Sequence, residues 1–282
     1  MGVRWDGKDR GWFCWPNPRL ERTAPSALPL KRKPLGGIIM NRIIKDIPEV
    51  FNINDIENGY IYNMRRGIQF KQTGLFLKIA FVGNVFIKIP SKRGWNDYHK
   101  YVKCAIPDPE DIRALESKER IENMEETIKT FPDLRNLLKW NISKDIIHWL
   151  LIYRLQYERC RSWIPVPLTK FVVLRFRRFG LLSFFKPALV QEKVTGTRLW
   201  DMIDFLTEKV SDRWKSNLPS ISRQLSPLLS REKIKHINWN IQNFIFNEEQ
   251  DKLWYVDLTP TLFISRWGNE HNLKGIREEF IM

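Results

Sequence analysis

The chain has 282 residues, of which 43% are apolar, enough for one sizeable domain or two lobes with a cleft between them. Lysine and arginine total 47 against 32 acidic residues, so anionic partners are expected. No apolar run approaches the length of a membrane span, and three widely spaced cysteines argue against a disulfide framework or a zinc site and favour a reducing cytoplasm.

Residues 1–39 differ in composition from the rest of the chain. They are rich in Pro, Arg, Gly and Trp, show no hydrophobic periodicity and lack the apolar core of a secretory signal peptide. A sequence of different character begins at Met40. We therefore expect residues 1–39 to be a disordered tail or a mis-assigned start. The rest of the chain contains 39 basic and 29 acidic residues, so it is still basic.

A three-stranded meander is predicted between residues 67 and 89. The β-rich runs 76–82 and 85–89 flank a two-residue Gly-Asn turn, which is a strong hairpin signal. Residues 67–71 supply the first strand. The third strand carries Lys88, for which the alternative is a solvent-facing lysine of the kind expected at Lys78.

Two helical segments follow the meander. Asp108-Pro109-Glu110-Asp111 is typical of a helix start, with a capping aspartate, a proline in the first turn and acids near the positive end of the helix dipole. The mostly charged residues that follow predict an exposed helical insertion near 109–130. A longer, apolar-periodic helix is predicted over 143–161, and the proline pair of Ile164-Pro165-Val166-Pro167 comes after it.

A basic and aromatic run begins in the next predicted strand, which covers residues 170–176, and continues past its end. Leu174-Arg175-Phe176-Arg177-Arg178-Phe179 interleaves cations with rings, a pattern that could bind phosphates and bases. The same alternation is typical of a half-buried strand with a solvated basic face, which is the favoured interpretation. Binding of nucleic acid is therefore a disfavoured alternative.

The strand over 188–194 breaks at Gly196 and is predicted to open into a helix near Leu199. Helices are expected at about 199–216 and 220–234, and a final helix from about Asn269.

The segment from His236 to Asp257 has an unusual spacing of polar residues. Phe244 to Asn247 and Lys252 to Val256 are predicted strands joined by a four-residue loop. If Asn247 pairs with Lys252, Asn243 lies opposite Val256 and beside Asp257. The alternative is an ordinary amphipathic hairpin, with a core histidine and a turn aspartate.

Residues 236–260 resemble the catalytic segment of the protein-kinase-like superfamily, especially its small bacterial branches, the aminoglycoside-phosphotransferase-like and lipopolysaccharide-core-kinase-like families. The resemblance implies a two-lobed α+β fold. Its antiparallel sheet lobe would cover residues 40–191 and its compact, mainly helical lobe residues 192–282.

The resemblance also implies a site for ATP and Mg²⁺. Lys88 would hold phosphates, Asn243 and Asp257 would bind metal, and His236 would have a structural role in the catalytic loop. The backbone of a hinge would meet the adenine, and its residues would be Gln191, Glu192, Lys193 and Val194.

The glutamate that would brace Lys88 is not decided by the sequence. Glu158 is the only glutamate of the helix over 143–161 and lies close to its end. Glu116 and Glu119, on the earlier polar helix, are rival candidates.

The main departure from the family pattern is Asn238, which stands where the general base is expected. A neutral amide cannot take up a proton at pH 7. A positioned base contributes on the order of a hundred- to ten-thousand-fold to the rate, so transfer should be slow. The phosphate-covering turn Lys71-Gln72-Thr73-Gly74 is a lesser departure, with one glycine in place of several. The alternative function is an inactive pseudokinase with a scaffolding or regulatory role.

The only indication of the phosphoryl acceptor is the short length of the chain after Asp257. Twenty-five residues follow Asp257, too few for the peptide-docking lobe of eukaryotic protein kinases. The compact bacterial type is the nearer analogy, and the expected acceptor is a hydroxyl of a small molecule or of a lipid-linked molecule.

Overall fold

The computed structural model describes most of the chain from residue 44 onward, and the described residues lie within one unit, Arg42–Met282. The described ranges are 44–47, 52–64, 67–72, 77–91, 124–138, 142, 144–178, 182–204, 206–234, 236–258 and 266–281. The predicted tail over 1–39 and the predicted helix start at Asp108 lie outside them.

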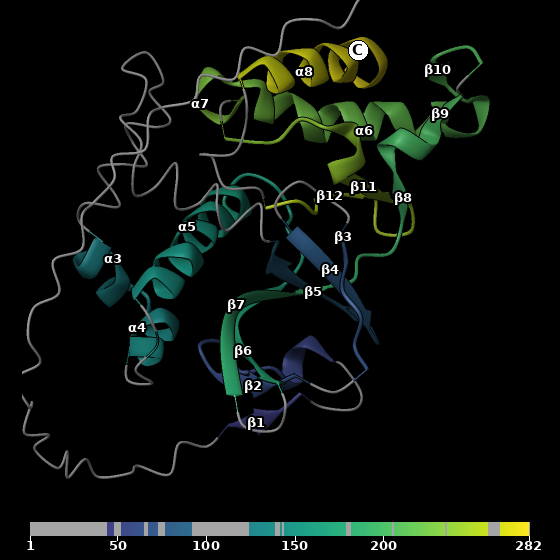
Figure 1. The fold of residues 1–282 in the computed structure, drawn as a ribbon. Helices are drawn as coiled ribbons and strands as arrows, with labels where there is room; N and C mark the ends of the chain where they lie inside the picture. The colour runs from purple at the N-terminus through teal and green to yellow at the C-terminus, as the bar shows by residue number, and fades with distance from the viewer. Residues whose placement is uncertain are drawn as a thin grey trace, which may run out of the picture. The chain divides into compact units, whose positions relative to one another are not determined.

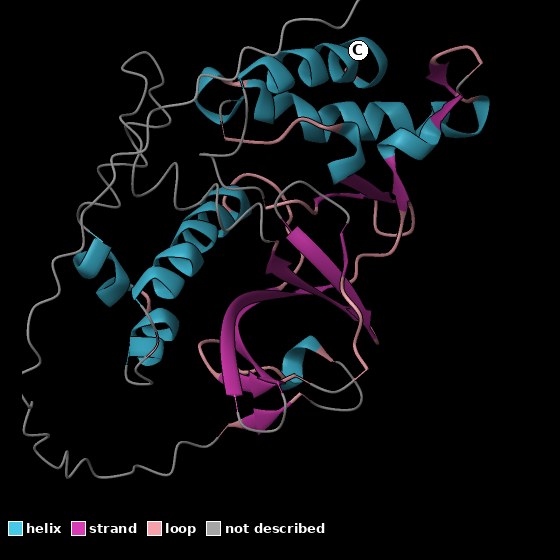
Figure 2. Ribbon diagram, in the orientation of Figure 1, coloured by secondary structure: helices cyan, strands magenta, loops and turns pink. Residues whose placement is uncertain are grey.

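A seven-stranded sheet is the largest sheet of the fold, and the helices α3 to α5 interrupt its strands in the chain between β5 and β6 (Figures 1 and 2). Its order is β1-β2-β6-β7-β5-β4-β3. The strands are β1 (Lys45–Asp46), β2 (Ile61–Asn63), β3 (Lys71–Gln72), β4 (Leu77–Val82), β5 (Val85–Pro90), β6 (Thr169–Arg178) and β7 (Leu182–Glu192). Strands β1, β2 and β6 pair in parallel, and the other pairs are antiparallel. The fold is therefore of the α+β class.

The predicted hairpin is confirmed as β4 and β5, and the first strand of the predicted meander is β3, which covers Lys71–Gln72 and not residues 67–71. Gly83 has a φ of +60°, which glycine adopts without strain, and the turn sets Val82 opposite Val85. Strand β3 pairs with β4. The third strand carries Lys88 between the buried side chains of Ile87 and Ile89.

Strand β6 is buried on both faces over its first half. Phe171 and Val173 belong to the larger core cluster, and Val172 and Leu174 to the smaller one. The sheet therefore packs a core on each side of this part of β6. The predicted half-buried strand with a basic face begins only at Leu174, which is itself fully buried. Partly exposed side chains begin at Arg175.

Three α-helices precede β6 among the described residues: α3 (Met124–Thr130), α4 (Pro132–Leu138) and α5 (Lys144–Arg161). A short 3-10 helix, η1 (Ile53–Asp55), lies before β2. The long helix α5 begins one residue after the predicted position. It packs against β6 and β7 and contributes Leu150 and Leu151 to the larger core cluster, which also includes residues after position 192, such as Leu199.

The chain after β7 is built from short elements. They are β8 (Thr197–Arg198), η3 (Leu199–Met202), β9 (Ile203–Asp204), β10 (Lys209–Val210), η4 (Asp212–Asn217), α6 (Leu218–Leu225), η5 (Ser226–Leu229), α7 (Arg231–Ile234), η6 (Ile241–Asn243), β11 (Phe244–Asn247), β12 (Lys252–Tyr255) and α8 (Arg266–Phe280).

The predicted helix over 199–216 is wrong. The Asp204 carboxylate accepts the Leu206 backbone N–H at 2.8 Å, and this local turn competes with helix and leads into the β9–β10 pair. The predicted helix over 220–234 is interrupted, because Pro227 has no N–H to continue the helical ladder after Leu225. The last helix begins at Arg266, three residues before the predicted Asn269.

Among helices in the described part of the chain, none combines the length and the hydrophobicity that a membrane crossing requires.

Candidate functional site

Asparagine side chains shape the loop that leads into β11. The Asn240 Oδ1 atom accepts the Gln242 N–H at 2.9 Å, and the Asn240 carbonyl accepts the Asn243 N–H at 2.8 Å. Asparagine favours such local turns because its side chain imitates a backbone acceptor. The resulting 3-10 turn, η6, ends with Asn243 at the start of β11.

The hairpin of β11 and β12 has the predicted register. Asn247 lies opposite Lys252, and Phe244 lies opposite Tyr255. One step further, the Val256 N–H donates to the Asn243 carbonyl at 2.9 Å. Asn243 and Asp257 therefore stand at the same open end of the hairpin.

Lys88 reaches this end of the hairpin from the large sheet. Its Nζ atom donates to the Val256 carbonyl at 3.1 Å. Burial lowers the pKa of the Lys88 amine, and the negative charge of Asp257 acts in the opposite direction. The structure thus brings Lys88, Asn243 and Asp257 together.

Three buried side chains that were not predicted from the sequence are close enough to Asp257 for its charge to affect their pKa values. Burial raises the pKa of the Tyr153 and Tyr255 hydroxyls well above the usual value, and the charge of Asp257 raises both further. Burial also raises the pKa of the Cys160 thiol to about 12. All three groups are neutral near pH 7, so they make the surroundings of Asp257 weakly polar.

A sequence signal for two of these residues exists in helix α5. Trp149, Tyr153, Gln156 and Cys160 recur at spacings of four, three and four residues, so they share one helix face. All four are buried. The apolar periodicity of this helix was noted in the sequence, but its direction toward Asp257 depends on the packing of α5.

Asn238 is held in the loop by backbone and side-chain contacts. Its N–H donates to the Tyr255 hydroxyl at 3.1 Å, and its Oδ1 atom accepts the Asn240 N–H at 3.4 Å. The Asn243 Nδ2 atom donates to the Asn238 carbonyl at 3.4 Å. The residue at the expected base position therefore orders the loop, and its amide cannot act as a base.

His236 joins the loop to helix α5. Its carbonyl accepts from the Gln156 Nε2 atom at 2.5 Å, and its Nδ1 atom lies 2.7 Å from Nη1 of Arg159. An arginine nitrogen can only donate, so Nδ1 of the histidine is the acceptor and is unprotonated. The indole of Trp163 packs against the ring at 5.9 Å between centroids.

Glu158 is engaged away from Lys88. Its carboxylate lies 2.9 Å from Nη2 of Arg154 and 3.9 Å from Nη1 of Arg161. The rival candidates Glu116 and Glu119 lie outside the described residues. The carboxylate that the structure does bring near Lys88 is that of Asp257.

The predicted hinge residues span the end of β7, which contains Gln191 and Glu192, and the two residues after it, Lys193 and Val194. The Glu192 N–H donates to the Leu168 carbonyl and the Lys193 N–H to the Asn84 carbonyl, both at 2.9 Å. The Gln191 side chain is buried and donates to the Thr169 hydroxyl at 3.5 Å. Within the described residues, the Val194 N–H has no backbone acceptor. Two of the hinge N–H groups expected to bind the adenine therefore already donate hydrogen bonds within the protein.

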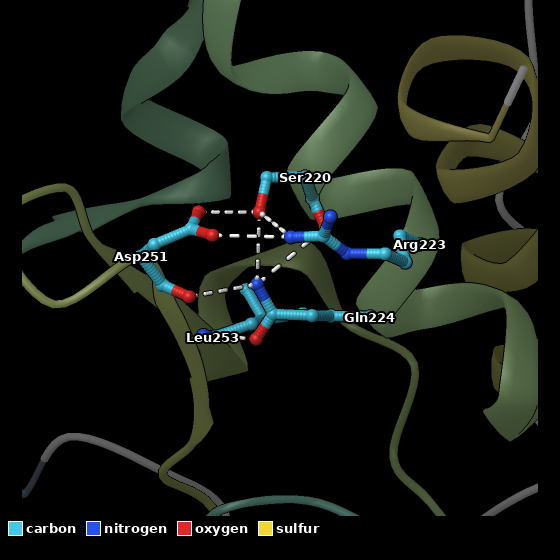
Figure 3. Close-up of polar contacts among 5 residues, drawn as sticks. All are labelled: Ser220, Arg223, Gln224, Asp251 and Leu253. Carbon is cyan, nitrogen blue, oxygen red and sulfur yellow. Dashed lines mark hydrogen bonds and ion pairs between the residues drawn. The ribbon is translucent and has the colours of Figure 1, made fainter.

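The turn end of the hairpin is fastened to helix α6 (Figure 3). The Gln224 side chain bonds two backbone groups: Nε2 donates to the Asp251 carbonyl at 3.1 Å, and Oε1 accepts the Leu253 N–H at 2.8 Å. The Asp251 carboxylate accepts from the Ser220 hydroxyl and, at 3.1 Å, from Arg223. These contacts hold β11 and β12, and hence the positions of Asn243 and Asp257.

The described residues contain no group of three or more His, Cys, Asp or Glu side chains placed to hold a metal ion. The candidate ligand pair, an amide and a carboxylate, is of a different kind, because it leaves most ligand positions to water and phosphate oxygens.

The chain matches no protein-family model, and a search of curated proteins finds no match.

Proposed function

We propose that this protein binds ATP with Mg²⁺ in a kinase-like manner and transfers a phosphoryl group slowly, to a hydroxyl of a small or lipid-linked molecule in the cytoplasm. The observation that carries the proposal is the meeting of Lys88 from β5 with Asn243 and Asp257 from the hairpin. In this proposal residues 40–191 and 192–282 act as two lobes, and the adenine of ATP lies near residues 191–194.

The cation part of the proposal depends on oxygen ligands. Mg²⁺ prefers carboxylate, carbonyl, water and phosphate oxygens, and it is usually held by one or two protein groups together with the substrate phosphates. The Asp257 carboxylate supplies one ligand. The Asn243 Nδ2 atom donates to the Asn238 carbonyl, so its Oδ1 atom is the one available to a cation.

The phosphate part depends on the buried amine. Burial disfavours the charged form of Lys88, and a phosphate group would supply the compensating negative charge. Phosphoryl transfer needs mainly positioning and charge stabilisation, so a lysine beside a bound cation provides much of what the reaction requires.

The second candidate function is that of a pseudokinase, a scaffolding or regulatory protein that binds nucleotide without transfer. Asn238 favours it, because the amide at the base position is committed to loop contacts and cannot accept a proton. Both candidates require nucleotide binding, and only the first requires turnover.

Thermal unfolding of the full chain with and without ATP and MgCl₂ tests nucleotide binding. At a nucleotide concentration of about 100 times Kd, the expected stabilisation is about 2.7 kcal/mol. Lys88→Gln and Asp257→Asn should lose it. Lys78→Gln, which removes an exposed lysine from the neighbouring strand β4, and Asp212→Asn, which removes an exposed carboxylate, are the matched controls.

Absence of an effect of ATP and MgCl₂ on the natural protein would contradict the proposal. Equal losses in Lys88→Gln and Lys78→Gln would also contradict it, because they would indicate binding by general positive charge.

A further inference from the structure

Strands β6 and β7 continue past their neighbours as a two-stranded ribbon. Within the described part of the chain, β2 pairs with β6 as far as Arg175, and β5 pairs with β7 as far as Leu189. Residues 175–178 of β6 pair with residues 182–185 of β7, and Lys186 follows opposite Leu174. We call residues 175–178 and 182–186 the distal ribbon.

The distal ribbon exposes large apolar side chains. Leu182 is 57% exposed, Phe184 46% and Phe185 39%. Single exposed apolar residues are common on protein surfaces, but three within four positions at a strand end are a concentration of exposed apolar area, which is typical of interaction sites.

The same ribbon is strongly basic. It contains the four cations Arg175, Arg177, Arg178 and Lys186 and no acidic residue. Among the described residues, no carboxylate lies within ion-pair distance of Arg175, Arg177 or Lys186. Burial and the charge of Lys78 lower the pKa of the Lys186 amine. The charge of this region calls for an anionic partner.

The apolar side chains lie on both faces of the ribbon. Successive residues of a strand point to opposite faces, so Phe184 and Phe185 face opposite ways. Phe185 shares its face with Arg175, which lies opposite it in the pair. Phe184 shares the other face with Phe176, and the Lys186 amine lies 5.8 Å from the centre of the Phe176 ring. Each face therefore combines apolar rings with cations.

This two-sided arrangement distinguishes between anionic partners. Single-stranded nucleic acid stacks its bases on aromatic rings along one groove, so rings on opposite faces cannot serve one strand together. A ribbon that enters a lipid interface is surrounded by lipid and uses both faces at once. When an amphipathic segment lies in a membrane surface, its apolar side chains reach the acyl chains and its cations stay at the headgroup phosphates.

We propose that the distal ribbon docks on a membrane surface that carries anionic lipids. Leu182, Phe184 and Phe185 enter the boundary between headgroups and acyl chains, and Arg175, Arg177 and Lys186 contact lipid phosphates. Three strand residues span about 10 Å, which matches the depth of interfacial insertion, about 5–10 Å. The docking does not depend on nucleotide binding.

Co-sedimentation of the full chain with sucrose-loaded vesicles tests this proposal. Binding is expected to vesicles of phosphatidylcholine with about 30 mol% phosphatidylglycerol, to weaken with added salt, and to be at least about tenfold weaker on phosphatidylcholine alone. Arg175→Gln combined with Arg177→Gln should weaken binding about thirtyfold, since each cation near the surface contributes about 1 kcal/mol. Leu182→Ser combined with Phe184→Ser should weaken it by about tenfold or more.

The matched control combines Leu206→Ser with Lys209→Gln. Both residues are exposed, Leu206 at 95%, and they lie between and on the short strands β9 and β10. The control and Lys88→Gln should bind vesicles as the natural protein does. Thermal unfolding of each variant verifies that it folds. Little change is expected for the substitutions of Arg177, Leu182, Phe184, Leu206 and Lys209, whose side chains are exposed.

Three results would overturn the proposal: no binding to anionic vesicles, equal losses in the ribbon variants and the control, or ribbon-dependent binding of a single-stranded oligonucleotide without vesicle binding. The last result would assign the ribbon to nucleic acid. Loss of nucleotide binding with retained vesicle binding would instead concern the proposed function alone.

Discussion

The Nζ atom of Lys88 donates a hydrogen bond to the Val256 carbonyl at 3.1 Å, across 168 residues of sequence. This contact ties the third strand of the large sheet to the end of the C-terminal hairpin. It also places a buried amine beside Asp257, where burial lowers the amine pKa. A buried cation costs stability in an empty site and becomes useful when an anion binds.

Asn238→Asp should increase ATP turnover. The carboxylate oxygen can still accept the Asn240 N–H, so the loop contacts are retained while a proton acceptor is added. We expect a gain on the order of a hundredfold or more in ADP formation with ATP and MgCl₂.

Gln242→Glu is the control for this gain, since it adds the same charge to an exposed position of the same loop. No gain in Asn238→Asp, with ATP binding retained, would favour the pseudokinase function.

Alkaline pH should destabilise the protein through Cys160. Its folded pKa is about 12 against an ordinary value of 9.0. The unfolded thiol therefore loses its proton first, so this contribution to stability is complete below pH 9 and is lost as the pH rises toward 12. By pH 10 the loss is about 1.4 kcal/mol.

Urea unfolding at pH 8 and pH 10 measures this loss. Cys160→Ala should be less stable at pH 8 because of the space it leaves, but its stability should fall less between the two values. An equal fall in both proteins would show that the Cys160 thiol does not cause the loss of stability between pH 8 and pH 10.

Gly196→Ala should strongly destabilise the fold. Gly196 has a φ of +136°, and an added Cβ would lie 2.4 Å from the Phe246 carbonyl oxygen, so backbone atoms would have to move. We expect a loss of about 3 kcal/mol or more in the free energy of unfolding.

Gly67→Ala separates conformational strain from the steric clash. Gly67 has a φ of +89° and open space around its Cα, so only the strain of about 1 kcal/mol applies. Similar losses in the free energy of unfolding of the two variants, measured by urea unfolding, would contradict the prediction that the clash with Phe246 destabilises Gly196→Ala.

Gln224→Ala should destabilise the hairpin more than Arg223→Ala does. Gln224 bonds backbone groups of Asp251 and Leu253, which would lose partners, at a cost of about 1–2 kcal/mol. Arg223 and Asp251 form an ion pair whose side chains are 72% and 56% exposed, so its loss should cost under about 1 kcal/mol.

Chemical unfolding of both variants measures the difference, and hydrogen exchange of the amides in β12 locates it. A larger loss in Arg223→Ala would show that the Arg223–Asp251 ion pair stabilises the turn more than the two hydrogen bonds of the Gln224 side chain do.

Elements with strong local signals were predicted well. The Gly83-Asn84 turn set the β4–β5 register, and the four-residue loop after Asn247 set that of β11 and β12, because turn geometry and alternation act over a few residues. Helix α5 was found from its periodicity. The region 199–216 failed because the turn at Asp204 overrides a helical pattern.

The sequence by itself determined which residues end the hairpin together, because strand pairing follows from adjacent segments and a short loop. Only the tertiary structure decided that Tyr153, Cys160 and Lys88 lie around Asp257, that Glu158 turns to Arg154 instead, and that β6 and β7 outrun their neighbours. These facts depend on the packing of segments far apart in the chain, and hydrophobic burial, which drives that packing, has no direction of its own.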